Sequence, residues 1–287
     1  MAWMLKHWTR PLLLSLHART ARIPFPVAEP LAFALALLTA AALAAALLRA
    51  ARQRLLAPLV RWLRGVSWTA LLLAAALALT WLPAMAQPVE TPPVPDADRL
   101  EWLCGELIDA LNASPLAFPA PEESARLAPE AAGLTGGAVK AARYPEWMRA
   151  AAVSGLFVPL TGEAIVDATA SPALIPFTAV HELAHLQGVA DEGAANILAW
   201  RRCMDAGGAF ADSARLWALR YAMGLLLNAD GAAWQRMRDK MKDPLAQVYR
   251  CSGGEALAHG AAGGLPRLSP ARGDYAALVG WLADGGG

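Results

Sequence analysis

The segment of the chain best suited to chemistry is His-Glu-Leu-Ala-His at residues 181–185. Because residues four apart lie on one face of a helix, His181 and His185 can bind the same Zn²⁺ ion. Glu182 lies about 100° further round that helix and can reach a water molecule on the metal. The spacing predicts a zinc site with Glu182 as the catalytic base, which would take a proton from the attacking water and return it to the leaving amine.

A third metal ligand is expected directly downstream, where Gly188 lets the chain reverse into a second helix. Two histidines, one carboxylate and an open position for water make up a catalytic zinc site. We favour Glu192, because Asn196 would share its helical face and could hold a ligand histidine by a hydrogen bond. Asp191 would then be the helix N-cap. Asp191 remains the alternative ligand, since the HExxHxxGxx(H/D) pattern of the metzincins has its third ligand there.

A β-hairpin is predicted upstream of the motif, from the β-leaning runs 151–160 and 163–168 and a turn at Leu160–Gly162. Zinc peptidases commonly pair such an edge strand with an extended substrate. Glu163 and Asp167 in the hairpin could orient a substrate, but acids at such positions are usually solvated, and we expect that here. Tyr249 and His259 are the first candidates for a donor to the oxyanion.

Two uncharged runs predict transmembrane helices over residues 30–49 and 66–86. The loop between them, residues 50–65, is rich in arginine and flanked by Arg49, which predicts that it is cytoplasmic. Residues 1–29 and everything after about residue 87 would then be extracytoplasmic. Four positive charges oppose this orientation: Lys6, Arg10, Arg19 and Arg22. Two alternatives are a pair of buried core helices and a signal-peptidase site at residues 84–86.

The charge distribution separates an apolar front from one globular domain. Residues 1–87 hold nine Lys/Arg and one acid, whereas residues 88–287 hold sixteen Lys/Arg and twenty-three acids. A Pro-rich linker over residues 87–98 joins the second apolar helix to a domain of residues 99–287. The acidic domain argues against nucleic acid as a partner. Cys203 and Cys251 could pair in an oxidising compartment and leave Cys104 free.

Helical spacing predicts most of the domain's elements. A first helix is expected over residues 100–111 with Asp98 as its N-cap, and the motif helix over residues 177–187. Residues 113–137 look irregular, with a short helix near residues 122–127. Helices should follow over residues 191–241, with breaks at 207–208 and 228–231, and over residues 274–283. The expected fold class is therefore α+β and mainly helical: two transmembrane helices followed by a domain with a small sheet.

The segments GLFVPLTGEAIVD and PFTAVHELAHLQGVADEGAAN resemble a bacterial membrane family known as domain of unknown function 3810. The resemblance is specific over residues 153–203 and weaker at residues 23–31, in the Arg-rich loop and after the second apolar helix. It implies a membrane-anchored zinc metallopeptidase of zincin type, with His181, His185 and Glu192 on the metal. Two departures are Ala194, where the family has a second acid, and residues 11–16, which are too short for the further apolar helix that the family often has.

The function expected from these observations is a membrane-anchored, zinc-dependent peptidase with an extracytoplasmic catalytic domain and a peptide or protein substrate. A second class of function is a non-catalytic membrane sensor or binding module that keeps the zincin fold. A third is a multi-pass structural protein with an accidental HExxH, which predicts that the two histidines lie far from Asp191 and Glu192 in space.

Overall fold

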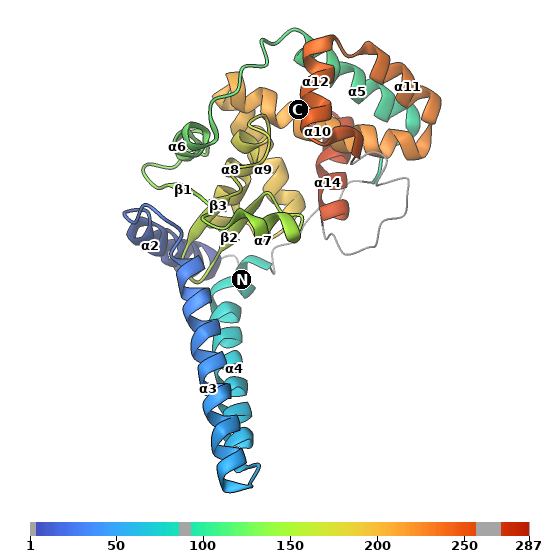
Figure 1. Ribbon diagram of the computed structural model, residues 1–287. Coiled ribbons are helices and arrows are strands. Elements are labelled where there is room, and N and C mark those ends of the chain that lie inside the picture. Colours follow the sequence, from blue (N-terminus) through green and yellow to red (C-terminus); the bar gives the residue numbers. More distant parts are fainter. Residues whose placement is uncertain (1–3, 86–92, 257–270, 287) are drawn as a thin grey trace.

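The structure of the protein is a computed structural model that describes residues 4–85, 93–256 and 271–286. Its described part is mainly helical with one small sheet (Figure 1). The helices are η1 (Leu5–Thr9), α2 (Arg10–Thr20), α3 (Ala28–Gln53), α4 (Ala57–Met85), α5 (Ala97–Asn112), α6 (Pro121–Ala131), α7 (Pro145–Ala150), α8 (Ile175–Leu186), α9 (Glu192–Ala206), α10 (Gly208–Ala229), α11 (Gly231–Lys240), α12 (Asp243–Cys251) and α14 (Ala271–Ala283).

Helices α3 and α4 lie side by side and project from the rest of the molecule as a stalk (Figure 1). Both contain stretches long and apolar enough to span a membrane, over Ala28–Gln53 and Ala57–Ala78. Only 6% of the apolar window of the first helix and 0% of that of the second is buried. The alternative of two buried core helices is therefore wrong, because these side chains face outward from the protein rather than into its core.

The sheet has three strands in the order β1-β3-β2: Val139–Ala141, Glu163–Val166 and Gly155–Val158. The predicted hairpin is confirmed, since β2 and β3 pair antiparallel with Phe157 opposite Ala164. Strand β1 was not predicted. It pairs parallel with β3 after a connection through α7 and β2, and such a long connection leaves no local turn pattern from which the strand could be predicted. Strand β2 is thereby left at one edge of the sheet.

Helix α8, which carries the HExxH segment, lies at the centre of the fold. All twelve of its residues are buried, and it contacts β2, β3, α6, α9 and α10. Pro176 stands in its first turn, where a missing N–H costs no hydrogen bond. The helix stops at Gln187 because Gly188 adopts φ +92°, a conformation that suits glycine. A helix enclosed on every side in this way holds its side chains in fixed positions.

The helices downstream follow the predicted breaks. Helix α9 ends at Gly207, whose φ is +70°, and α10 ends before Asp230, which caps α11 through the backbone N–H groups of Ala232 and Ala233. The N-cap of α5 is Asp96 and not Asp98, because the Asp96 carboxylate accepts the N–H of Arg99. Helix α6 is longer than the short segment predicted within residues 113–137.

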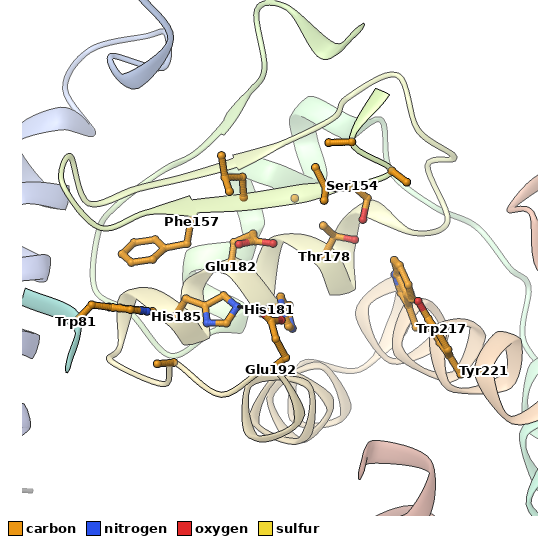
Figure 2. Close-up of a pocket in the computed structure, with 16 residues that line it drawn as sticks. Trp81, Ser154, Phe157, Thr178, His181, Glu182, His185, Glu192, Trp217 and Tyr221 are labelled. Carbon is orange, nitrogen blue, oxygen red and sulfur yellow. Dashed lines mark hydrogen bonds and ion pairs between the residues drawn. The ribbon is translucent and has the colours of Figure 1, made fainter. Parts of the chain in front are cut away.

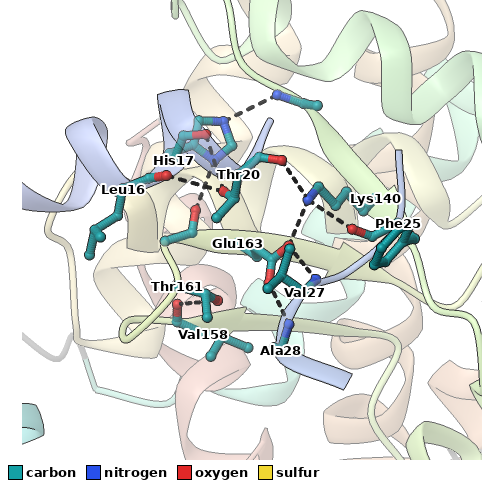
Figure 3. Close-up of polar contacts among 12 residues, drawn as sticks. Leu16, His17, Thr20, Phe25, Val27, Ala28, Lys140, Val158, Thr161 and Glu163 are labelled. Atoms are coloured by element: carbon teal, nitrogen blue, oxygen red, sulfur yellow. Dashed lines mark hydrogen bonds and ion pairs between the residues drawn. The ribbon is translucent and has the colours of Figure 1, made fainter. Parts of the chain in front are cut away.

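The N-terminal residues form part of the globular body. Helix α2 lies against α8 and β3, with Leu13 and His17 buried. His17 Nδ1 lies 2.8 Å from the carbonyl oxygen of Gly162, and His17 Nε2 accepts the N–H of Ala138 at 3.2 Å (Figure 3). Burial lowers the pKa of His17. Residues 11–16 thus belong to a helix that packs on the domain.

A buried ion pair fixes the start of α3 to the sheet. Lys140 Nζ on β1 lies 2.6 Å from Glu163 Oε1 on β3, and the two carboxylate oxygens of Glu163 accept the N–H groups of Val27 and Ala28 (Figure 3). Lys140 also donates to two carbonyl oxygens, those of Thr20 and Phe25. The expectation that Glu163 is solvated is therefore wrong, because it caps the N-terminus of a long helix, where a carboxylate is stabilised.

Asp167 is also buried rather than solvated, with 3% of its surface exposed. Its carboxylate accepts the N–H and hydroxyl of Thr169 and so closes the turn after β3.

Cys203 and Cys251 are not paired, and Cys104 is free as well. Cys203 lies in the core whereas Cys251 is exposed.

Candidate metal centre

The structure brings His181, His185 and Glu192 together in one pocket (Figure 2). One ligand atom from each of the three lies within 4.8 Å of the other two. His181 Nε2 is 3.0 Å from Glu192 Oε2, and His185 Nε2 is 3.4 Å from Glu192 Oε1. The two Nε2 atoms are 3.1 Å apart. The separation that an accidental HExxH predicts is therefore not observed.

Local structure explains how Glu192 reaches the histidines. Gly188 ends α8, and three residues later α9 begins with Asp191 as its N-cap, whose carboxylate accepts the N–H of Ala194 at 2.8 Å. That hydrogen bond occupies Asp191 at the helix terminus, whereas Glu192, the first residue of α9, extends toward α8. Of the two acids considered as the third ligand, the structure places Glu192 with the histidines.

The donor set fits Zn²⁺. Two imidazole nitrogens and one carboxylate oxygen are the three protein ligands of many catalytic zinc sites, and a fourth position is then left for water or substrate. His185 Nδ1 lies 2.6 Å from the carbonyl oxygen of Val189, which can only accept, so Nδ1 carries a proton. Nε2 is the nitrogen that faces Glu192 and His181, and it can bind a metal once it has lost its own proton. This carbonyl, in the turn that follows Gly188, orients His185, and its role was not predicted from the sequence.

Asn196 does not make the hydrogen bond expected of it. Its side chain is fully buried, yet neither its nitrogen nor its oxygen has a partner among the described residues. His181 Nδ1 is buried and without a partner as well. The amide therefore lies one turn after Glu192, as its spacing requires, but it does not hold either histidine.

Glu182 lies in the same pocket, between α8 and strand β2 (Figure 2). Burial raises its pKa, and the neighbouring His181 and His185 oppose that shift. The strand approaches so closely that only glycine fits at Gly155. A Cβ atom there would overlap the Glu182 carboxylate oxygen Oε1 and would lie 2.7 Å from Thr178 Cγ2. The backbone of β2 thus limits where the Glu182 carboxylate can lie.

The charges of the cluster are strongly coupled. Burial favours a protonated Glu192, but hydrogen bonds from His181 and His185 outweigh it, and the pKa of Glu192 falls well below its usual range. Burial likewise opposes a charge on His185, but the hydrogen bond from Glu192 and the charges of Glu182 and Glu192 raise the pKa of His185 to about 9. A divalent cation would take over the role of these protons, since metal binding and protonation compete for the same lone pairs.

The walls of the pocket are largely apolar or uncharged. They comprise Trp81, Ala151, Ala152, Val153, Ser154, Gly155, Leu156, Phe157, Thr178, Ala190, Trp217 and Tyr221. The Tyr221 ring stacks on Trp217 at 5.9 Å, and both project from α10 at one end of the pocket (Figure 2). Trp81 comes from α4 at the other end, with its ring centroid 6.3 Å from that of His185.

Of the two oxyanion donors considered from the sequence, the structure describes only Tyr249. Tyr249 lies on α12, is buried in the hydrophobic core and does not line the pocket. His259 lies outside the described residues. The sequence analysis did not predict that Tyr221 lines the pocket. Tyr221 lies 29 residues beyond Glu192 on a helix, and no local pattern marks that position.

Comparison with known proteins gives a family for the chain. Residues 8–252 match the model of a family described as "Protein of unknown function (DUF3810)". Neither the curated proteins nor the solved structures contain a match. The matched region includes α3, α4, the sheet and all three residues of the candidate metal centre. The chain therefore belongs to the DUF3810 family, as the HELAH and TGEA segments predicted.

Proposed function

We propose that this protein is a membrane-anchored zinc peptidase of zincin type. The observation that carries the proposal is the convergence of His181, His185 and Glu192 within 4.8 Å, next to the buried carboxylate of Glu182. A catalytic zinc site needs three protein ligands, an open position and a base, and these four side chains supply the ligands and the base. No charged side chain other than these lines the described pocket, so none competes for the metal.

The mechanism assigns one role to each group of the chain. Zn²⁺ held by the three ligands would polarise a peptide carbonyl and lower the pKa of a bound water to about 7. Glu182 takes the proton of the attacking water on its carboxylate and then transfers it to the leaving amine. Val189 holds His185 in the tautomer that presents Nε2.

The oxyanion needs a hydrogen-bond donor near the metal. Three hydroxyl-bearing side chains line the described pocket: Ser154, Thr178 and Tyr221. The Thr178 hydroxyl donates to the carbonyl oxygen of Leu174 within its own helix. Tyr221 has the longest side chain of the three and projects from α10 at one end of the pocket (Figure 2), so we assign the oxyanion donor to Tyr221.

Strand β2 would bind the substrate backbone. It pairs with β3 along one edge, and no described strand pairs with its other edge. Residues Gly155 to Phe157 of this strand line the pocket. An extended peptide can add to such an edge through main-chain hydrogen bonds, which would place its carbonyls over Glu182 and the ligands without strict reading of its sequence.

Helices α3 and α4 would anchor the enzyme. They expose large apolar side chains along their length, among them Phe33 and Leu38 on α3 and Leu72 on α4, each more than 60% exposed. Surfaces of this kind are stable in lipid and not in water. Five arginines lie at the tip of the stalk, away from the catalytic domain, and the positive-inside rule makes that tip cytoplasmic and the domain extracytoplasmic.

The first test is the metal content of the purified full-length protein in detergent, measured by elemental analysis. The full chain is required because α2 and Trp81 are part of the folded body. We expect near-stoichiometric zinc in the wild type and in Asp191→Asn, which preserves a capping side chain. We expect zinc to be lost in His185→Ala and Glu192→Ala.

Peptide-library cleavage then tests the activity, with Glu182→Gln as the inactive control. Zinc in the wild type without cleavage of any peptide would favour the non-catalytic sensor or binding module. Absence of zinc from the folded wild type would refute the peptidase. Loss of zinc in Asp191→Asn with retention in Glu192→Ala would reverse the choice of the third ligand.

A further inference from the structure

The end of α4 forms one wall of the candidate metal pocket. Trp81 lines the pocket, and its ring centroid lies 5.5 Å from that of Phe157 on β2 and 6.3 Å from that of His185 (Figure 2). The Phe157 ring is in turn stacked at 6.4 Å from His185. A side chain of the stalk thus lies in direct proximity to a metal ligand, and it builds an apolar wall together with the edge strand.

Helix length gives the position of Trp81 along the stalk. Trp81 follows Arg64, the last arginine of the tip, by seventeen residues, which corresponds to about 26 Å of helix. On α3, Glu29 precedes Arg49 by twenty residues, or about 30 Å. A bilayer has a hydrocarbon core of about 30 Å. Trp81 and Glu29 therefore both lie at the membrane surface on the side of the domain, where tryptophan is enriched.

Contacts at the start of α3 hold the domain at the membrane surface. Glu163 accepts the N–H groups of Val27 and Ala28, and the carboxylate of Glu29 accepts the N–H of Arg143 at 3.1 Å. Together with the packing of Trp81, these contacts join both helices of the stalk to the sheet and to α8. The pocket is thus fixed at the membrane surface rather than carried on a flexible linker.

The pocket lining matches a peptide that leaves a bilayer. Apart from the metal-binding residues and Glu182, its described lining carries no charged side chain. The 6.3 Å between Trp81 and His185 corresponds to about two residues of extended chain. A bond cleaved at the metal would therefore lie within a few residues of the point at which a substrate enters the membrane.

From these observations we propose that the substrate is a polypeptide anchored in the same membrane, cut in the uncharged segment that adjoins its own membrane helix. An apolar side chain next to the scissile bond packs against Trp81 and Phe157, so Trp81 determines specificity. The inference rests on the proposed peptidase function and adds to it the substrate class and the position of the cleaved bond relative to the membrane surface.

The experiment uses the full-length protein in nanodiscs of phosphatidylcholine and phosphatidylglycerol, with substrates incorporated in the same discs. The first substrate is one apolar helix followed directly by a randomised segment of uncharged residues. In the second, a rigid (EAAAK)-type helix of about 20 residues raises the same segment by about 30 Å. The third is the segment alone as a soluble peptide. Products are identified by mass spectrometry.

We expect the adjacent segment to be cut at least about tenfold faster than the raised one, although both share the membrane with the enzyme. Trp81→Ala should slow cleavage of the adjacent segment about tenfold without loss of zinc, and Trp81→Phe should restore most of the rate. Trp68→Ala is the matched control, because Trp68 lies on the same helix, 64% exposed and remote from the pocket, and should leave the rate unchanged.

Equal cleavage of the adjacent, raised and soluble segments would overturn this inference while leaving the peptidase intact. The same holds if Trp81→Ala and Trp68→Ala behave alike. If no substrate is cut by a zinc-loaded wild type, the proposed function itself fails, and this inference with it. The presence or absence of any cleavage by the zinc-loaded wild type therefore distinguishes the two failures.

Discussion

Replacement of Gly155 by alanine is the most direct probe of the geometry that surrounds the proposed base. Gly155 lies on β2 directly over α8, and its φ is not in the left-handed region, so the backbone itself accepts alanine. The added Cβ would overlap Glu182 Oε1 and lie 2.9 Å from Glu182 Cδ, whereas ordinary contact begins at 3.4 Å. The Glu182 carboxyl carbon must therefore retreat by about 0.5 Å, and its oxygen by more.

The expected effect of Gly155→Ala is on the rate and not on the metal. A displacement of about 1 Å at a catalytic group can cost about 100-fold, equivalent to about 2.7 kcal/mol of transition-state stabilisation. None of the three candidate metal ligands is among the atoms nearest to the new methyl group, so zinc should be retained. Some loss of stability should accompany the substitution, because the new Cβ would also lie 2.7 Å from Cγ2 of Thr178, a buried β-branched side chain that can move little.

The assay compares the zinc content, the melting temperature and kcat/KM of wild type, Gly155→Ala and Gly231→Ala. Gly231 is the matched control, since a Cβ there meets nothing within 4 Å and its backbone is unstrained. Full activity of Gly155→Ala would refute the placement of Glu182 as the base under β2. Loss of zinc together with activity would show that the strand supports the ligands rather than the base.

Four further predictions concern other parts of the molecule. Tyr221→Phe should keep zinc and lower kcat by about 100-fold if its hydroxyl stabilises the oxyanion, and an unchanged kcat would reassign that donor. Glu163→Ala should lower the free energy of unfolding by about 3–5 kcal/mol in a denaturant titration, because it leaves Lys140 buried without its partner. Burial alone would raise the pKa of Glu163, but hydrogen bonds from Lys140 and from two backbone N–H groups outweigh it and lower that pKa. The ionised Glu163 carboxylate therefore stabilises the fold above pH 4.5, and this stabilisation is lost as the pH falls toward the lower pKa of the folded state. Melting curves from pH 7 downward should therefore be less steeply pH-dependent in Glu163→Gln, and parallel curves would contradict this. Asn196→Ala should leave zinc affinity unchanged within about twofold, whereas loss of about 10–100-fold would show that the amide does hold a ligand histidine.

The limits of prediction are clear at the third ligand. From spacing alone, Asp191 and Glu192 were both reasonable, because both lie at the start of one helix after the same turn. The structure distinguishes them by direction: Asp191 accepts the N–H of Ala194, and Glu192 meets His181 and His185. The hydrogen bond expected of Asn196 is absent because four-residue spacing fixes which face a side chain occupies but not what lies opposite that face.

The sequence by itself determined the elements with local signatures. The motif helix, the hairpin, the breaks at residues 207–208 and 228–231 and the two long apolar helices all follow from periodicity, turn residues and composition over short windows of sequence. The same local pattern also predicts that the two histidines lie on one face, because residues four apart share a face of any α-helix.

Only the tertiary structure decided which distant residues meet. The Glu163 carboxylate caps a helix that begins about 135 residues earlier in the chain, Trp81 closes the pocket of a motif one hundred residues later, and β1 joins the sheet through a parallel pairing. Contacts of this kind depend on how whole elements pack, and packing is set by the shape of buried surfaces rather than by any local pattern. The sequence therefore predicted the two histidines and the base of the candidate site from five consecutive residues, whereas the choice of Glu192 and the position of the site against the stalk required the tertiary structure.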